Sequence, residues 1–162
     1  MSAHSDAGRE FLRHTVATLA YRGGKTLRGA PASFATFRAG TSSRTPVEIV
    51  AHLGDLLAWA ASLAEGKHEW KNAPPGAWDA EVERFFAGLR RFDDILAGEL
   101  PLGGPLERLF QGPVADALTH VGQLAMLRRL AGAPIKGENY FKAEIQTGQV
   151  GPEQEAPRFE FD

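Results

Sequence analysis

The sequence has no cysteine among its 162 residues. This absence excludes a disulfide framework, a thiolate metal site and a cysteine nucleophile. An excess of charge of one sign is also missing, because 18 basic and 20 acidic side chains leave a net charge of −2 with histidine neutral. A chain without a basic field has little to attract the phosphates of duplex nucleic acid, so we expect no nucleic-acid partner.

Segments that would direct the chain to a membrane are not evident either. The first ten residues, MSAHSDAGRE, lack the basic start and apolar run of a secretory signal. We expect no apolar stretch to approach the roughly 18 residues that a membrane span needs. These absences favour a cytoplasmic protein that does not bind a membrane.

The overall composition is typical of a globular protein. Hydrophobic residues make up 43% of the chain and charged residues 23%, which is ordinary for a folded domain. A chain of this length can bury a substantial core as one unit. We therefore expect a single domain over residues 1–162, with residues 1–4 and about 152–162 irregular.

Apolar residues recur at helical spacing in four segments, separated by joints rich in glycine and proline. The first helix is predicted to begin near Ser5 or Asp6, because both are good N-cap residues. It is predicted to end near Tyr21, because Gly23 and Gly24 follow as a strong stop signal.

The second helix opens with the sequence TPVE at 45–48. In this pattern threonine caps the helix, proline takes the first helical position and glutamate completes a capping box. The helix is predicted to run to about Glu65. A third helix is predicted over about 79–97, with acidic residues in its first turn, where the helix dipole favours them.

The last long helical segment, 105–130, contains Gly112-Pro113, and proline inside a helix removes a hydrogen bond and clashes with the preceding turn. We expect a break or a kink there, with Gly112 near the cap and Pro113 restarting the helix. The remainder, 134–162, is predicted to hold at most a short helix around 139–146. Four amphipathic helices with few short joints predict an all-α fold, a four-helix bundle with an irregular C-terminal extension.

Two histidines and an aspartate fall where these helices should be apolar. At about 100° of rotation per residue, His52 lies in the apolar stripe of the second helix, and Asp116 and His120 lie in that of the last. Core-facing groups of this kind need partners, since a buried unpaired charge costs roughly 3–5 kcal/mol. Because residues four apart share one helix face, Asp116 and His120 can point at the same ion as His52.

A divalent metal ion would be a partner for all three side chains. Neutral imidazole and carboxylate together suit zinc, nickel, iron(II) or manganese. Two histidines and one carboxylate leave coordination positions free, and an ion with a free position lowers the pKa of water or a thiol toward neutrality. A protein without cysteine could in this way use the thiol of a small molecule.

Each of these residues also has a simpler interpretation. A histidine on an apolar face is more often hydrogen-bonded within a core than bound to a metal. Asp116 would lie in the first turn of a restarted helix, where the dipole favours an acid, or it would orient a histidine. Among their neighbours, Asp55 is expected at the flank against solvent or another helix, Trp59 in the core, and Gln123 near a metal-bound ligand or at the bundle edge.

Three stretches of the chain resemble the DinB-like (DinB/YfiT) superfamily of metalloenzymes: TPVEIVAHLGDLLAW at 45–59, ADALTHVGQLAMLRRLAG at 115–132 and GENYFKAEIQTGQVG at 137–151. The family pattern has one histidine on the second helix and His-x3-His on the last long helix, often continuing with glutamine. His52 and His120 match the first and last positions, and Gln123 follows as expected. Asp116 stands where the family usually has histidine.

The resemblance implies a helical bundle that holds a divalent metal, commonly nickel or zinc, through three side chains with positions open to water or a ligand. Characterised relatives include thiol-dependent isomerases and S-transferases that use low-molecular-weight thiols such as mycothiol or bacillithiol, and family proteins are often dimers. It therefore implies a metal-dependent transferase or hydrolase that acts on a small molecule as a homodimer.

Two other interpretations stay open at this point. The first is a non-catalytic binding or stress-associated bundle protein that has lost or altered the metal site, which the aspartate at position 116 favours. The second is a purely structural dimer module whose two histidines are hydrogen-bonded in the core. The sequence does not name the catalytic residues or the residues that would bind a cofactor.

Overall fold

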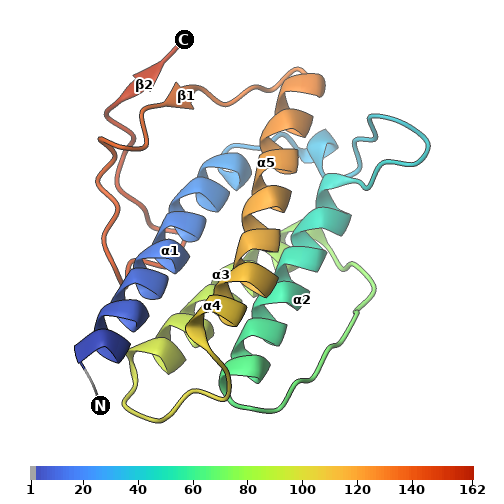
Figure 1. The fold of residues 1–162 in the computed structure, drawn as a ribbon. Helices are drawn as coiled ribbons and strands as arrows, with labels where there is room; N and C mark the ends of the chain where they lie inside the picture. The colour runs from blue at the N-terminus through green and yellow to red at the C-terminus, as the bar shows by residue number, and fades with distance from the viewer. Residues whose placement is uncertain (1–2) are drawn as a thin grey trace.

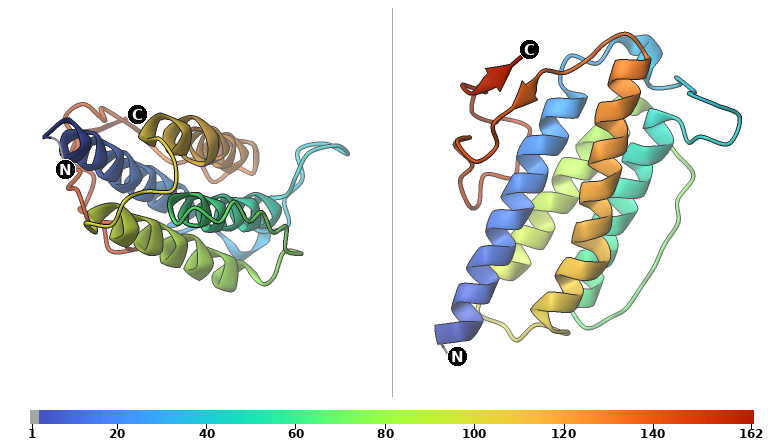
Figure 2. Two further views of the ribbon diagram at one scale, coloured as in Figure 1. Left: turned by 60° about the horizontal axis from the view of Figure 1, so that its bottom comes forward. Right: turned by 45° about the horizontal axis from the view of Figure 1, so that its top comes forward.

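The computed structural model describes residues 3–162, with side chains from residue 7 onward. It is mainly helical, which confirms the predicted all-α class. Four long helices pack side by side, and the C-terminal segment runs along one side of them (Figures 1 and 2). These helices are α1 (Ala3–Leu27), α2 (Pro46–Ala64), α3 (Trp78–Ala97) and α5 (Ala115–Leu130). The shorter elements are η1 (Ala32–Phe34), α4 (Leu106–Leu109), η2 (Phe110–Val114), β1 (Gly137–Glu138) and β2 (Glu160–Phe161).

The core lies between the four long helices and is built from aromatic and branched aliphatic side chains. Each fully buried leucine or phenylalanine contributes about 1.5–3 kcal/mol relative to an exposed one. The residues buried most completely come from every long helix and from the α1–α2 connection, and they include Val16, Leu19, Phe34, Ile49, Leu53, Leu57, Phe85, Leu89, Phe92 and Leu124. This core holds α2 and α5 in the positions on which the candidate site depends.

Helix α1 is longer than its sequence predicts. It runs to Leu27, so the prediction that Gly23 and Gly24 end it near Tyr21 is wrong. Gly23 has a packing role instead, since a Cβ atom there would lie 2.7 Å from the ring of Phe85 on α3. The helix also begins at Ala3, before the predicted caps and inside the predicted irregular start, whose residues 1 and 2 lie outside the described chain.

Helix α2 begins as predicted. The hydroxyl of Thr45 accepts a hydrogen bond from the backbone N–H of Glu48, and the Glu48 carboxylate accepts one from the backbone N–H of Thr45 at 2.6 Å. The capping box is therefore confirmed. By length and composition alone α2 could also cross a membrane, with a mean hydropathy of 1.4, so the expectation that no stretch approaches that length is wrong. It is a core helix here, since 67% of that window is buried inside the protein.

Pro113 does not break the last helix. The chain continues from α4 into α5 through a wide π-helical turn, η2, in which the N–H of Ala115 reaches the carbonyl of Phe110. The wider turn accommodates a proline, which has no N–H to donate. The predicted restart at Pro113 is therefore wrong, and Asp116 lies within a continuous helical segment, where an acid has no special preference from a free helix start.

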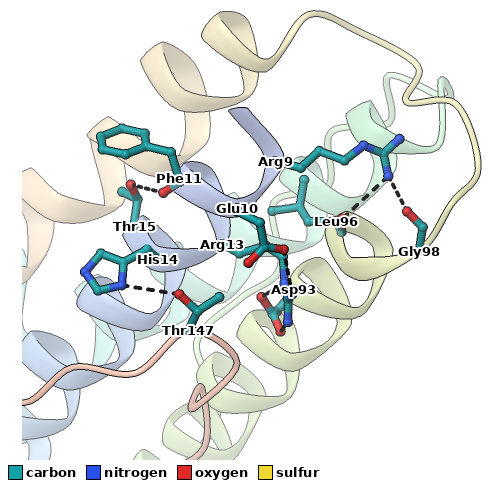
Figure 3. A network of polar contacts seen from close by, with 10 residues as sticks. All are labelled: Arg9, Glu10, Phe11, Arg13, His14, Thr15, Asp93, Leu96, Gly98 and Thr147. Atoms are coloured by element: carbon teal, nitrogen blue, oxygen red, sulfur yellow. Dashed lines mark hydrogen bonds and ion pairs between the residues drawn. The ribbon is translucent and has the colours of Figure 1, made fainter. Parts of the chain in front are cut away.

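Polar contacts near the start of α1 tie it to the end of α3. Arg13 donates to both carboxylate oxygens of Asp93, at 3.0 and 3.2 Å. Arg9 donates to the backbone carbonyls of Leu96 and Gly98, where a helix end leaves acceptors unpaired (Figure 3). These charged groups hold the end of the bundle that lies away from α1's glycine pair.

The C-terminal segment is anchored on α1 by a buried cluster of charged and polar side chains. Glu138 accepts hydrogen bonds from the Tyr21 hydroxyl at 2.6 Å and from the Lys25 ammonium at 2.7 Å. Lys25 also pairs with Glu160 at 2.9 Å. Burial lowers the pKa of Lys25, but its hydrogen bonds to the two glutamates outweigh burial and raise it above its ordinary value.

The remainder of this segment is largely irregular, as predicted for the C-terminal extension. No helix forms around 139–146, where at most a short one is predicted, since those residues adopt turns and irregular backbone. Strands β1 and β2 instead pair antiparallel, with Gly137 opposite Phe161. The end of the chain is therefore fixed against the helices by one short strand pair and by the cluster around Glu138.

The two adjacent glycines of α1 predict opposite effects of the same substitution. Gly23→Ala lowers the free energy of unfolding by about 1–3 kcal/mol, because its methyl group collides with Phe85 in a filled core. Gly24→Ala, whose Cβ would meet Phe86 only at 3.5 Å, raises it by up to about 1 kcal/mol through helix propensity. Urea unfolding followed by circular dichroism measures both, and a stabilising Gly23→Ala would contradict the packing role.

Candidate metal centre

The structure brings together the three side chains predicted to form a site. His52 lies on α2, and Asp116 and His120 lie one turn apart on α5. The Nε2 atom of His52 is 3.6 Å from one Asp116 carboxylate oxygen, and the Nδ1 atom of His120 is 3.3 Å from the other. The two imidazole rings have their centres 4.6 Å apart.

The three residues lie at the border between the core and solvent. Neighbours in the same helical stripes, Ile49 and Leu124, are fully buried, whereas the side chains of His52 and His120 are 17% and 12% exposed and that of Asp116 is 46% exposed. The predicted helical rotation therefore holds, but both histidines lie at the edge of the apolar stripe. A ligand from solvent can reach them from that edge.

The surroundings of His52 favour a neutral ring. Burial lowers the pKa of His52, the positive charges of His120 and Arg44 lower it further, and Asp116 opposes them only in part. The Nδ1 atom of His120 is 2.9 Å from the backbone carbonyl of Asp116. Because a carbonyl only accepts, Nδ1 carries the proton there and the Nε2 atom of a neutral ring is left free to bind an ion.

The donor set and its spacing fit a divalent ion. One donor atom from each of His52, Asp116 and His120 lies within 4.8 Å of the other two. Donors bound tetrahedrally to one zinc ion at about 2.1 Å lie about 3.4 Å apart, so the side chains need to move closer together by up to about 1.4 Å to complete such a site. Two imidazoles and a carboxylate form a set that zinc, nickel, iron(II) and manganese all accept.

A cavity of about 510 Å³ opens beside the two histidines, between the start of α2 and the second half of α5. This volume lies within the range of small-molecule pockets. A second hollow of about 320 Å³ lies on another side of His52 and reaches the loop before α3. The residues that line the larger cavity are Ser43, Arg44, Ile49, His52, His120, Gln123, Met126 and Leu127.

Two residues of the site come from loops and are not predicted by helical periodicity. Trp70, in the connection between α2 and α3, meets the ring of His52 edge-on with 5.9 Å between ring centres. Trp70 also meets Trp59 in the same way at 5.7 Å. Arg44 precedes the cap of α2 and lines both hollows beside His52. The sequence signal for Arg44 is its nearness to the start of α2, whereas Trp70 lies in the middle of the connection between α2 and α3 and has no such signal.

The structure also shows where the neighbouring residues Asp55, Trp59 and Gln123 lie. Asp55 is buried and accepts a hydrogen bond from Arg84 of α3 at 2.7 Å, so its contact with a neighbouring helix is confirmed. Trp59 packs against the core, as expected. Gln123 lines the cavity, one turn after His120, so its place near a ligand stays a prediction.

Comparisons of the chain with protein-family models, with curated proteins and with solved structures find no match. The DinB-like resemblance therefore stays a prediction from the sequence. The group of His52, Asp116 and His120 is an observation of the structure itself, and it stands without that resemblance.

Fluorescence of Trp70 is expected to report an ion bound beside His52. Paramagnetic Cu²⁺ quenches an indole over short distances, and Trp70 is the tryptophan in ring contact with His52. Titration with Cu²⁺ should quench wild-type fluorescence, and Trp70→Phe should remove most of that quenching. Trp78→Phe is the matched control, because Trp78 packs against Phe34 instead. Equal quenching in the two variants would contradict a site at His52.

Proposed function

We propose that the protein binds a divalent metal ion through His52, Asp116 and His120 and acts on a small molecule as a metal-dependent enzyme of the DinB-like type. The observation that supports this most directly is the convergence of three ligand side chains from two helices at the wall of a cavity. Nickel or zinc is the ion that the resemblance favours, and iron or manganese suits the same donors.

A divalent ion bound there would act as a Lewis acid that lowers the pKa of water or of a low-molecular-weight thiol toward neutrality. The chain supplies the remaining parts of the site. His120 is oriented by its hydrogen bond to the backbone of Asp116, and Asp116 contributes a negative charge between the two imidazoles. Buried Ile49 and Leu127 limit the access of water on one side of the cavity.

Transfer of a thiol conjugate and hydrolysis are the two reaction classes that such a site suits, because each needs an activated sulfur or oxygen nucleophile. We also propose that the four long helices form a DinB-like bundle and that the protein works as a cytoplasmic homodimer, without a nucleic-acid or membrane partner. These further proposals come from the composition and from the resemblance.

A non-catalytic protein that keeps the bundle with an altered metal site is the second candidate. The observation that favours it is the aspartate at position 116, which replaces the family's usual histidine and is half exposed. In such a protein the two imidazoles would bind an ion weakly, or would bind no ion and keep only their polar contacts with Asp116. The two candidates differ in the affinity of the site for metal.

Removing either histidine is expected to abolish metal binding. Wild-type protein should take up one equivalent of nickel or zinc, and His52→Ala and His120→Ala should take up none above background. His14→Ala is the matched control, because His14 is exposed on α1 and its ring is hydrogen-bonded to Thr147, away from the site (Figure 3). Elemental analysis measures the uptake, and equal content in all four proteins would refute the site.

Bound metal is also expected to stabilise the fold. At an ion concentration 100 times the dissociation constant, the free energy of unfolding rises by about 2.7 kcal/mol. Thermal melts with added zinc or nickel and with chelator measure this difference. A midpoint indifferent to both in wild type would favour the structural interpretation of the two histidines.

The residue at position 116 distinguishes the two candidate functions. In a native aspartate site, both Asp116→Asn and Asp116→His weaken metal binding, on the order of 10–100-fold, because the carboxylate and the shape that it sets are lost. Isothermal titration of the metal-free protein with zinc measures the affinity. Tighter binding by Asp116→His, without turnover, would instead support the non-catalytic bundle protein.

A further inference from the structure

The larger cavity has one permanently charged residue on its wall. Among the residues that line it, only Arg44 carries a full charge at every pH at which the protein is folded. The other polar groups are two imidazoles, the amide of Gln123 and the hydroxyl of Ser43. A single cation beside neutral polar groups favours a ligand that carries a negative charge.

Besides burial and the charge of His120, the charge of Arg44 lowers the pKa of His52, but Arg44 itself has no direct partner. Within residues 7–162, the Arg44 side chain forms no ion pair or hydrogen bond with another residue. The nearest acid along the chain, Glu48, already accepts hydrogen bonds from the backbone and hydroxyl of Thr45, and it pairs with Arg38 at 3.6 Å. The guanidinium of Arg44 is therefore available to an anion that enters the cavity.

We propose that Arg44 binds the carboxylate of a small, largely apolar substrate whose other end reaches the His52–His120 pair. This inference rests on the proposed function for the reaction, but binding of the carboxylate needs only the cavity. A guanidinium holds a carboxylate through two parallel charge-assisted hydrogen bonds. The apolar walls of Ile49, Met126 and Leu127 then receive the hydrocarbon part of the molecule.

The charges around the cavity favour an anion with one negative charge. One guanidinium balances one carboxylate, whereas a phosphate ester near neutral pH carries almost two charges. The second charge would lie close to the carboxylates of Glu48 and Asp116, which line the neighbouring hollow and the metal site. A phosphate would therefore be repelled more strongly than a carboxylate.

The helix also sets the approximate length of the substrate. Arg44 lies just before the first residue of α2, Pro46, and His52 lies six residues further along the helix. A helix rises about 1.5 Å per residue, so Pro46 and His52 lie about 9 Å apart along the axis of α2. A short carbon chain has about this length, and Gln123 lines the same cavity.

The test uses hexanoate, its neutral analogue hexanamide, and hexyl phosphate as probes of the full-length, metal-free protein. Ligand-observed NMR titration measures the three dissociation constants. We expect hexanoate to bind more tightly than either of the other two. Arg44→Gln should weaken hexanoate about tenfold or more, since hydrogen bonds to a charged group are lost, and should leave hexanamide unchanged. Arg44→Lys keeps the charge but loses the planar pair of N–H donors. Its dissociation constant for hexanoate should therefore lie between those of wild type and Arg44→Gln.

Arg108→Gln is the matched control. Arg108 is another exposed arginine, and it lines a separate cavity near Trp59. Hexanoate should bind this variant as it binds wild type. Equal binding of hexanoate to wild type and Arg44→Gln would overturn the proposal, and so would tighter binding of hexyl phosphate than of hexanoate.

The metal site is tested separately on the same proteins. Arg44→Gln should bind zinc at least as tightly as wild type, because Arg44 is not one of the three ligands and its positive charge acts on His52. A protein that binds hexanoate through Arg44 but takes up no metal would keep this inference and refute the proposed function. Hexanoate could instead bind only when zinc is present, and equally well to wild type and Arg44→Gln. That result would show that the ion binds the carboxylate, and it would overturn the role of Arg44.

Discussion

Helices α2 and α5 approach so closely that the ring centres of His52 and His120 lie 4.6 Å apart, and the Asp116 carboxylate lies near both rings. Placing two imidazoles at the edge of an apolar core removes them from much of their water, which is favourable only if each finds a partner. The Asp116 carboxylate lies within 3.3–3.6 Å of a nitrogen of each ring and gives both a polar partner. The contact of these three side chains is therefore the feature on which the cavity, the metal site and the proposed chemistry depend.

The rest of the fold keeps the two helices in this arrangement. Gly23 lets α1 approach α3 closely, and buried phenylalanines fill the space between the helices. The π-helical turn at Pro113 carries the chain into α5 without a break, so Asp116 lies on a rigid helix just after it. Turns of this kind often occur near functional sites, where they change the direction in which the following residues point.

The sequence predicts the helices and the three central residues well, because both depend on periodicity and on local capping. The TPVE signal at 45–48 forms the expected capping box, and helical rotation correctly brings His52 toward Asp116 and His120. The errors arise where one residue type has two uses. Gly23 serves close packing where a helix stop is expected, and Pro113 fits a wide turn where a break is expected.

Residues that reach the site from loops could not be predicted in this way. Trp70 and Arg44 lie outside the long helices, so no repeating pattern relates them to His52. Their positions depend on how the connections fold back over α2, which is a property of tertiary packing. Trp70 closes one side of the histidine pair, and Arg44 gives the cavity its charge.

Anomalous diffraction from crystals soaked in nickel or zinc tests the central claim most directly. Data collected on either side of the absorption edge locate the ion and identify it at the same time. The account predicts one strong peak within bonding distance of His52, Asp116 and His120. A peak elsewhere on the protein, or none between these side chains at saturating metal, would contradict it.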